Sequence, residues 1–159
     1  MDLGGMEDAA ASEDEDGQAT AEHTAALMLE RDRASRMLGI GVDRVARGEA
    51  VLSMTVRDDM INGHGTCHGG FIFTLADSAL AFASNSYDQL SVAAACDISF
   101  LKPAQPGDRL TAAAREVYRE GRNGIYDVEV RNQSNEVIAL FRGKSRTVPG
   151  QMTDPAPTQ

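Results

Sequence analysis

The sequence predicts an α+β domain in which one antiparallel sheet wraps around a single apolar helix, and two observations carry this prediction. Residues 71–83 are apolar on nearly every face, as in a helix that is covered from all sides. The segments that flank this helix alternate apolar and polar residues with a period of two, which is typical of half-buried strands. One sheet wrapped around one helix is the economical way to cover such a helix.

The first half of the chain is expected to lead into this apolar helix. The elements expected there are, in order, a helix from Thr20 or Thr24 to Met37, strands at residues 40–45 and 50–56, a loop of about residues 57–68, and the apolar helix from Gly69 to about Asn85. Gly39 is a suitable C-terminal cap for the first helix, because glycine readily adopts the left-handed conformation that ends helices.

The second half of the chain keeps the period of two. Strands are expected over residues 92–100, 109–119, 126–131 and 137–148. The later connections are of hairpin length and rich in turn residues, so these strands should be antiparallel. This order of elements is the hotdog architecture. The outer face of such a sheet stays partly exposed, which predicts oligomerisation.

The formal net charge of −9 is concentrated at one end of the chain. Residues 1–26 hold eight acidic residues and no Lys or Arg, so the remainder is close to neutral and nucleic acid is not an expected partner. The acidic segment lacks aromatic residues, which favours disorder. The predicted organisation is a disordered acidic tail at residues 1–22, one domain at residues 23–148, and a disordered tail at residues 149–159.

Cysteine usage and hydropathy indicate the compartment. Cys67 and Cys96 form no C-x-x-C motif, no signal peptide is evident, and no apolar run approaches the length of a membrane span. The sequence therefore predicts a cytoplasmic protein without a membrane partner.

The candidate active site centres on Asp77, a carboxylate inside the apolar helix, where a buried Asp is rare unless something satisfies it. The preceding residues, 62–70, read NGHGTCHGG and bring polar side chains and exposed backbone N–H groups to the helix start. A helix N-terminus is electropositive and suits a developing oxyanion. These features favour acyl transfer over the alternative of a structural Asp bonded to backbone N–H groups, and desolvation should raise the pKa of Asp77.

Two other kinds of site are weaker interpretations of the same residues. A metal site would use His64, His68, Cys67 and Asp77, but their spacing matches no established ligand pattern, so no metal or cofactor is expected. Cys67 as a nucleophile would need a base and a lowered pKa, for which only the helix start gives support.

Three runs of sequence resemble a known family. They are NGHGTCHGGFIFTLADSALAFASN, ISFLKPAQPGDRLTA and GIYDVEVRNQSNEVIALFRGKS, and they resemble the PaaI-like (phenylacetic acid degradation) hotdog-fold acyl-CoA thioesterases over about residues 37–147. The specific feature is an Asn six residues before His-Gly-Gly, followed by an Asp nine residues after that His.

The resemblance implies roles for individual residues. Asp77 matches the catalytic carboxylate, as nucleophile or general base, and Gly70 matches the N–H donor that polarises the thioester carbonyl. His68 and Asn62 match residues that orient the thioester or the attacking water. Candidate contacts to substrate or coenzyme A are Gly69, Thr66, Lys102, Arg142 and Lys144, the cations because coenzyme A carries phosphates.

The resemblance also implies an aryl-type substrate, of the phenylacetyl-CoA or hydroxyphenylacetyl-CoA class, and a site at a dimer interface, with two dimers pairing into a tetramer. Two other functions remain open from the residues alone. A hotdog dehydratase would pair His68 with Asp77, and a non-catalytic acyl-CoA sensor would bind without hydrolysis.

Overall fold

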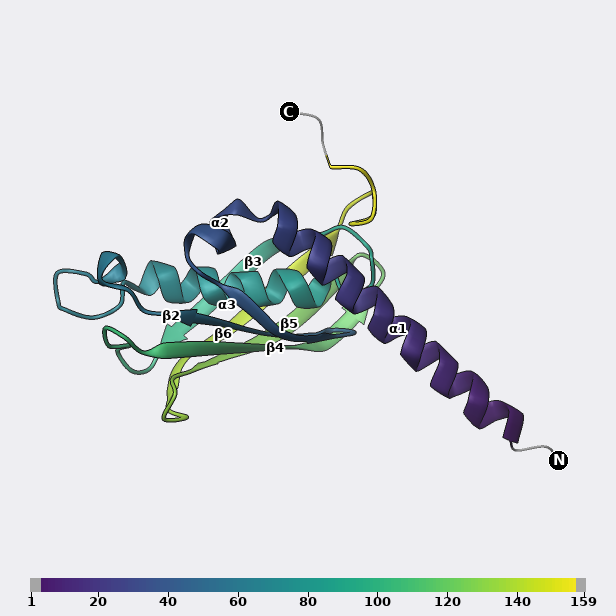
Figure 1. Ribbon diagram of the computed structural model, residues 1–159, viewed down its shortest axis with the longest axis horizontal. Coiled ribbons are helices and arrows are strands. Elements are labelled where there is room, and N and C mark those ends of the chain that lie inside the picture. Colours follow the sequence, from purple (N-terminus) through teal and green to yellow (C-terminus); the bar gives the residue numbers. More distant parts are fainter. Residues whose placement is uncertain (1–3, 157–159) are drawn as a thin grey trace.

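The computed structural model describes the backbone of residues 4–156 and the side chains of residues 11–156 (Figure 1). Its elements are, in order, α1 (Gly4–Arg31), α2 (Arg33–Met37), β1 (Gly41–Ala46), β2 (Glu49–Thr55), the short 3-10 helix η1 (Asp58–Met60), α3 (Gly69–Ser84), β3 (Ser91–Phe100), β4 (Arg109–Glu120), β5 (Asn123–Arg131) and β6 (Val137–Thr147). The predicted hotdog fold is confirmed.

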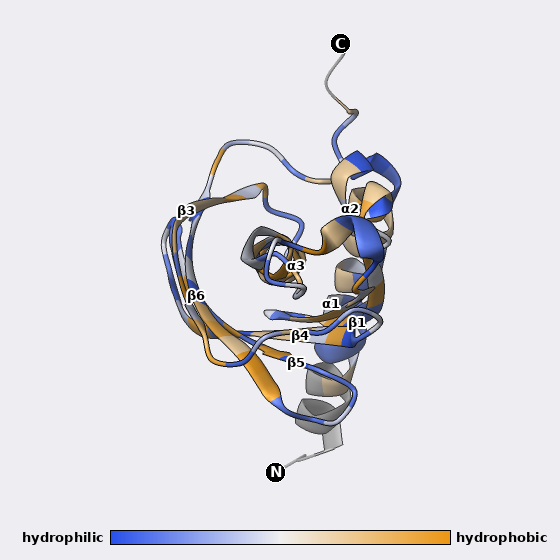
Figure 2. Ribbon diagram, turned by 90° about the vertical axis from the view of Figure 1, so that its left-hand side faces the viewer, coloured by the Kyte–Doolittle hydropathy of each residue, from blue (hydrophilic) through white to orange (hydrophobic). Residues whose placement is uncertain are grey.

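The six strands form one antiparallel sheet in the order β1-β2-β4-β5-β6-β3. The hairpins β4–β5 and β5–β6 follow from short connections, whereas β3 pairs with β6 and lies at an edge of the sheet. Figure 2 shows the sheet curling around α3, so that the inward residues of several strands meet the same helix. This curl covers most of the surface of α3.

Small residues let the sheet approach α3 closely. Gly143 of β6 faces the helix, and a Cβ atom built on it would lie 2.4 Å from Cδ2 of Leu80, which is fully buried. The same side of β6 carries Phe141, whose ring packs edge-on against that of Phe73 with centroids 5.4 Å apart. A residue larger than glycine at position 143 would therefore force the packed side chains of Leu80 and Phe141 to move.

The N-terminal segment differs from the sequence prediction. Residues 4–22, expected to be disordered, belong to α1, and a break at Asp32 separates α1 from α2. Alanine and glutamate, abundant in residues 7–26, are strong helix formers, and this local preference outweighs the charge pattern that favoured disorder. Asp32 accepts a hydrogen bond from Ser35 N (2.9 Å) and so starts the second helix.

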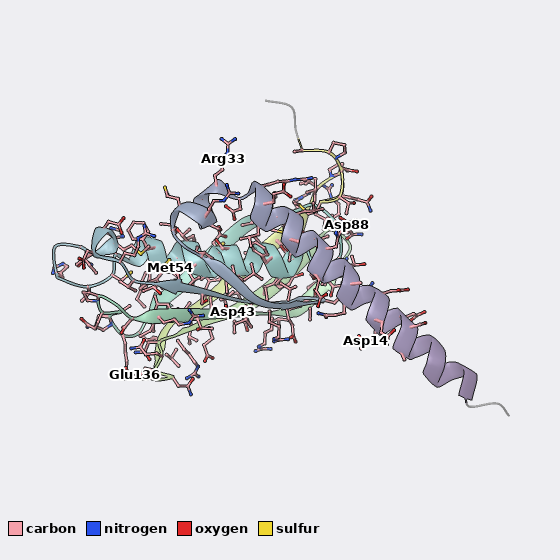
Figure 3. The ribbon with its side chains drawn as sticks, viewed as in Figure 1. Asp14, Arg33, Asp43, Met54, Asp88 and Glu136 are labelled. Carbon is pink, nitrogen blue, oxygen red and sulfur yellow. The ribbon has the colours of Figure 1, made fainter. Side chains whose placement is uncertain are left out.

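Part of α1 is anchored to the domain. Ala21, Thr24 and Ala25 are buried against β1, and Gln18 donates to the Val45 carbonyl (2.9 Å). The rest of α1 extends beyond the sheet (Figure 1), and Asp14 lies on that part (Figure 3).

The C-terminal segment also differs from the expected disorder as far as the structure describes it. Residues 149–156 form no helix or strand, yet Arg31 of α1 donates to the carbonyls of Met152 (2.9 Å) and Asp154 (3.1 Å). Thr153 donates through its backbone N–H and hydroxyl to Asp88, which Figure 3 places beside this segment. Residues 1–3 and 157–159 lie outside the described residues.

None of the described helices is both long and apolar enough to cross a lipid bilayer.

Replacing Gly143 with alanine should destabilise the fold, because the added methyl group overlaps Leu80 in a packed interior. We expect the free energy of unfolding in urea to fall by about 1–3 kcal/mol. The neighbouring Lys144→Ala is the matched control, since Lys144 is exposed and its loss should change the free energy by less than about 0.5 kcal/mol. Equal stability of both variants would contradict the close approach of β6 and α3.

Candidate active site

The start of α3 presents two consecutive glycine N–H groups with different surroundings. His68 caps the helix, and its Nδ1 accepts a hydrogen bond from Gly70 N (2.9 Å). Because Nδ1 accepts, the neutral ring carries its proton on Nε2, on an exposed side chain that can donate to a ligand. The Gly70 N–H, expected from the sequence to polarise the thioester, is therefore already paired within the chain.

The N–H of Gly69 is the available donor. Among the described residues it makes no hydrogen bond, as is usual for the first residue of a helix. A Cβ atom built on Gly69 would lie 3.0 Å from Cζ of Phe100, so a larger residue here would require that ring to shift. Gly69 offers the donor, and Gly70 is held by the cap.

Asn62 organises the loop before the helix. Its Oδ1 accepts hydrogen bonds from His64 N (2.9 Å), Thr66 N (3.3 Å) and the Thr66 hydroxyl (3.4 Å). Gly65, at φ +78°, permits the tight turn between them. This role in building the loop was missed in the sequence analysis, although Asn-Gly is a turn signal. The amide nitrogen of Asn62 donates to no described residue, so it remains available to a ligand.

Asp77 is half-buried on α3, and its carboxylate has one weak partner. The Cys96 thiol of β3 lies 3.9 Å from Asp77 Oδ1. Burial raises the pKa of Asp77 above its ordinary value, and the Cys96 thiol offsets this in part. The direction of this pKa shift agrees with the expectation from the sequence. Raised carboxylate pKa values are frequent at catalytic sites.

Cys67 is a buried structural residue. Its side chain is 4% exposed, and burial raises the pKa of its thiol to about 11. A thiol with this pKa is protonated at neutral pH and is a poor nucleophile. Among the described side chains, no group of three or more His, Cys, Asp or Glu residues is arranged to bind a metal ion.

The cations proposed for coenzyme A do not gather at the helix start. Arg142 and Lys144 are exposed on the face of β6 that points away from α3. The Arg142 side chain donates from Nε to Asp127 Oδ1 (2.6 Å) and from Nη2 to Asp127 Oδ2 (2.9 Å). Lys102 pairs with Glu136 (2.8 Å), which Figure 3 labels. Because β-strand side chains alternate between faces, the register of β6 puts its cations outside the wrapped sheet.

Comparisons with known proteins show which family the chain belongs to. The Thioesterase superfamily matches residues 64–139. The acyl-coenzyme A thioesterase PaaI of Escherichia coli K12 is 46% identical over 129 residues, which cover 81% of this chain and 92% of that protein. The chain belongs to the PaaI-like family of the thioesterase superfamily. The resemblance inferred from the sequence motif is confirmed.

Solved structures of similar proteins show the same fold. The structure of E. coli PaaI, from the phenylacetic acid degradation operon, has a TM-score of 0.83 and covers 84% of this chain and 97% of its own. The TT0310 protein of Thermus thermophilus is 41% identical with a TM-score of 0.71, over 74% of this chain and 98% of its own. A Streptococcus mutans UA159 protein bound to acetyl CoA is 28% identical with a TM-score of 0.67, over 70% of this chain and 90% of its own.

Two variants separate the roles of Asn62. Asn62→Asp keeps the acceptor that builds the loop and loses the amide donor, so we expect near-native thermal stability and at least about a tenfold loss of activity toward an acyl-CoA. Asn62→Ala loses both and should also lower the melting temperature. Thermal unfolding and steady-state kinetics measure the two effects. Full activity of Asn62→Asp would show that only the loop matters.

Proposed function

We propose that this protein is an acyl-CoA thioesterase that hydrolyses an aryl-type acyl-CoA, of the phenylacetyl-CoA or hydroxyphenylacetyl-CoA class, to the free acid and coenzyme A. One observation carries the proposal. In a chain of the PaaI-like family, a half-buried carboxylate with a raised pKa accompanies a helix start whose first N–H is unpaired among the described residues. These are a base or nucleophile and an oxyanion donor, the two groups that thioester hydrolysis needs.

The chemistry follows from these two groups. Asp77 attacks the thioester carbonyl to form a mixed anhydride, or removes a proton from a water molecule that attacks it. The Gly69 N–H and the α3 dipole stabilise the tetrahedral oxyanion. The thiolate of coenzyme A then leaves without strong acid catalysis. In the nucleophilic route this step leaves the acyl group on Asp77 as the anhydride, which water hydrolyses to release the free acid and regenerate the carboxylate. The Nε2–H of His68 and the amide of Asn62 supply donors that orient the substrate. The residues involved require no cofactor beyond coenzyme A, which is part of the substrate.

One chain does not bring these groups together. Asp77 follows Gly69 by eight residues, which separates them by about 12 Å along the helix axis. A nucleophile must lie roughly 3 Å from a carbonyl carbon whose oxygen is on the donor. The site we propose therefore combines Asp77 of one protomer with the helix start and Asn62 loop of a second protomer.

The surface around Asp77 suits a second copy of the chain. Cys96, its neighbour, belongs to β3, and no described strand pairs with the outer edge of β3. The side chain of Val92 on β3 is 52% exposed although apolar. An open edge with exposed apolar residues is a common site of strand pairing between chains. Leu140, 46% exposed on the outer face of β6, is a further exposed apolar residue and supports the proposal that two dimers pair into a tetramer through this face.

The activity is tested with a panel of aryl- and alkyl-acyl-CoA substrates, by following released thiol with a chromogenic reagent. We expect hydrolysis by the wild type and a loss of at least about 100-fold in kcat for Asp77→Asn, because an amide can neither attack nor accept the proton. Asp97→Asn, which removes an exposed carboxylate from the opposite face of β3, is the matched control and should retain the rate.

Three results would overturn the assignment. Near-native hydrolysis by Asp77→Asn would make the carboxylate structural. Conversion of a 3-hydroxyacyl-CoA to an enoyl-CoA without thiol release would indicate a dehydratase. Stabilisation by acyl-CoA without any turnover would indicate a binding protein.

The shared site is tested by mixing two inactive variants. Asp77→Asn and Asn62→Asp are each expected to lose most of their activity, but a mixed dimer contains one site with both residues intact. After subunit exchange we expect about a quarter of wild-type activity, because half of the dimers are mixed and each has one working site. Light scattering gives the oligomeric state. Absence of recovery despite proven exchange would place both residues in a site of one chain.

A further inference from the structure

Strand β3 runs alongside α3 in the opposite direction and contacts both ends of the proposed site. Cys96 meets Asp77, and Phe100 lies over Gly69. Four residues of strand span about 13 Å and eight residues of helix about 12 Å, so the two contacts fall in register. The inward side chains of β3 therefore form one wall along the helix from the carboxylate to the N–H donor.

Cys96 is the one described side chain that hydrogen bonds to Asp77. Helix α3 contains no other titratable residue. The helix-facing residues of β6 are uncharged, and Asp97 of β3 is exposed on the opposite face. Tyr126 of β5 and Glu116 of β4 are bonded to each other (2.9 Å). No other charged or titratable group on these elements, within the described part of the chain, is a hydrogen-bond partner of Asp77.

We propose that Cys96 is a positioning residue for the reaction: its thiol donates to Asp77 Oδ1, holds the carboxylate in one orientation and favours its ionised form. The proposal rests on the proposed function of Asp77. In this proposal the edge strand β3 helps to prepare the Asp77 carboxylate for the reaction.

The ionisation of both groups is consistent with this role. Burial and the nearby Asp77 raise the pKa of Cys96, so the thiol stays protonated at neutral pH and is able to donate. The hydrogen bond lowers the pKa of Asp77, whereas burial raises it. Removing the donor while keeping the burial should therefore raise the pKa of Asp77. Since the reaction needs the ionised carboxylate, the acid limb of the pH–rate profile should move to higher pH.

Two substitutions at Cys96 separate the hydrogen bond from the volume of the side chain. Cys96→Val keeps an apolar side chain of similar size and removes the donor. Cys96→Ser keeps a donor. Ser99→Ala is the matched control, because it removes a γ heteroatom from the exposed face of the same strand.

The measurement is kcat/KM against pH for the wild type and the three variants. We expect the acid limb of Cys96→Val to shift upward by about 0.3–1 pH unit, the shift that corresponds to the loss of one weak hydrogen bond from a thiol to the ionised carboxylate. Below that limb its activity should fall about twofold to tenfold relative to wild type. Cys96→Ser should remain close to the wild-type profile, and Ser99→Ala should match it. A wild-type acid limb in Cys96→Val would overturn the proposal.

A second readout does not depend on turnover. Titration of the Asp77 carboxyl carbon by NMR should give a higher pKa in Cys96→Val than in the wild type, and an unchanged pKa would overturn the proposal even if no substrate is hydrolysed. Should Cys96→Val fail to fold, Cys96→Ala takes its place in both measurements. Failure of the proposed function appears instead as absence of thiol release by the wild type.

Discussion

The burial of α3 inside the curved sheet is the constraint on which the rest of the structure depends. A helix of 16 residues with one charged side chain is stable in water only if most of its surface is covered. The sheet meets this requirement by curling, and Gly143 allows the close approach that the curl needs. Covering the sides of the helix leaves two accessible features, the helix start and the strip beside β3 where Asp77 lies.

The two glycines at the helix start are present for different physical reasons. A Cβ atom on Gly69 would meet the ring of Phe100, and one on Gly70 would meet the ring of His68, each at 3.0 Å. His68 satisfies the N–H of Gly70 and leaves that of Gly69 unpaired among the described residues. A helix N-terminus has several donors without partners, and a single cap decides which of them a ligand can use.

The environment of Asp77 combines two opposing effects. Partial burial weakens the solvation of the carboxylate, which raises its pKa and makes the ionised form more reactive. A carboxylate with the same burial and no donor would ionise only at a higher pH. The Cys96 thiol is a weak donor, so it favours ionisation without solvating the carboxylate as strongly as water does.

The sequence by itself determined the strands, the central helix and the motif from Asn62 to Asp77, because periodicity and motif spacing are local properties of the chain. For residues 1–22 it predicted a disordered tail from their charge, whereas the structure describes residues 4–22 as part of α1, in line with their helix propensity and the packing of α1 on β1. Only the tertiary structure decided which glycine N–H is free, that Arg142 faces away from α3, and that β3 lies beside β6. These features depend on strand register and on contacts between distant segments, which no local pattern specifies.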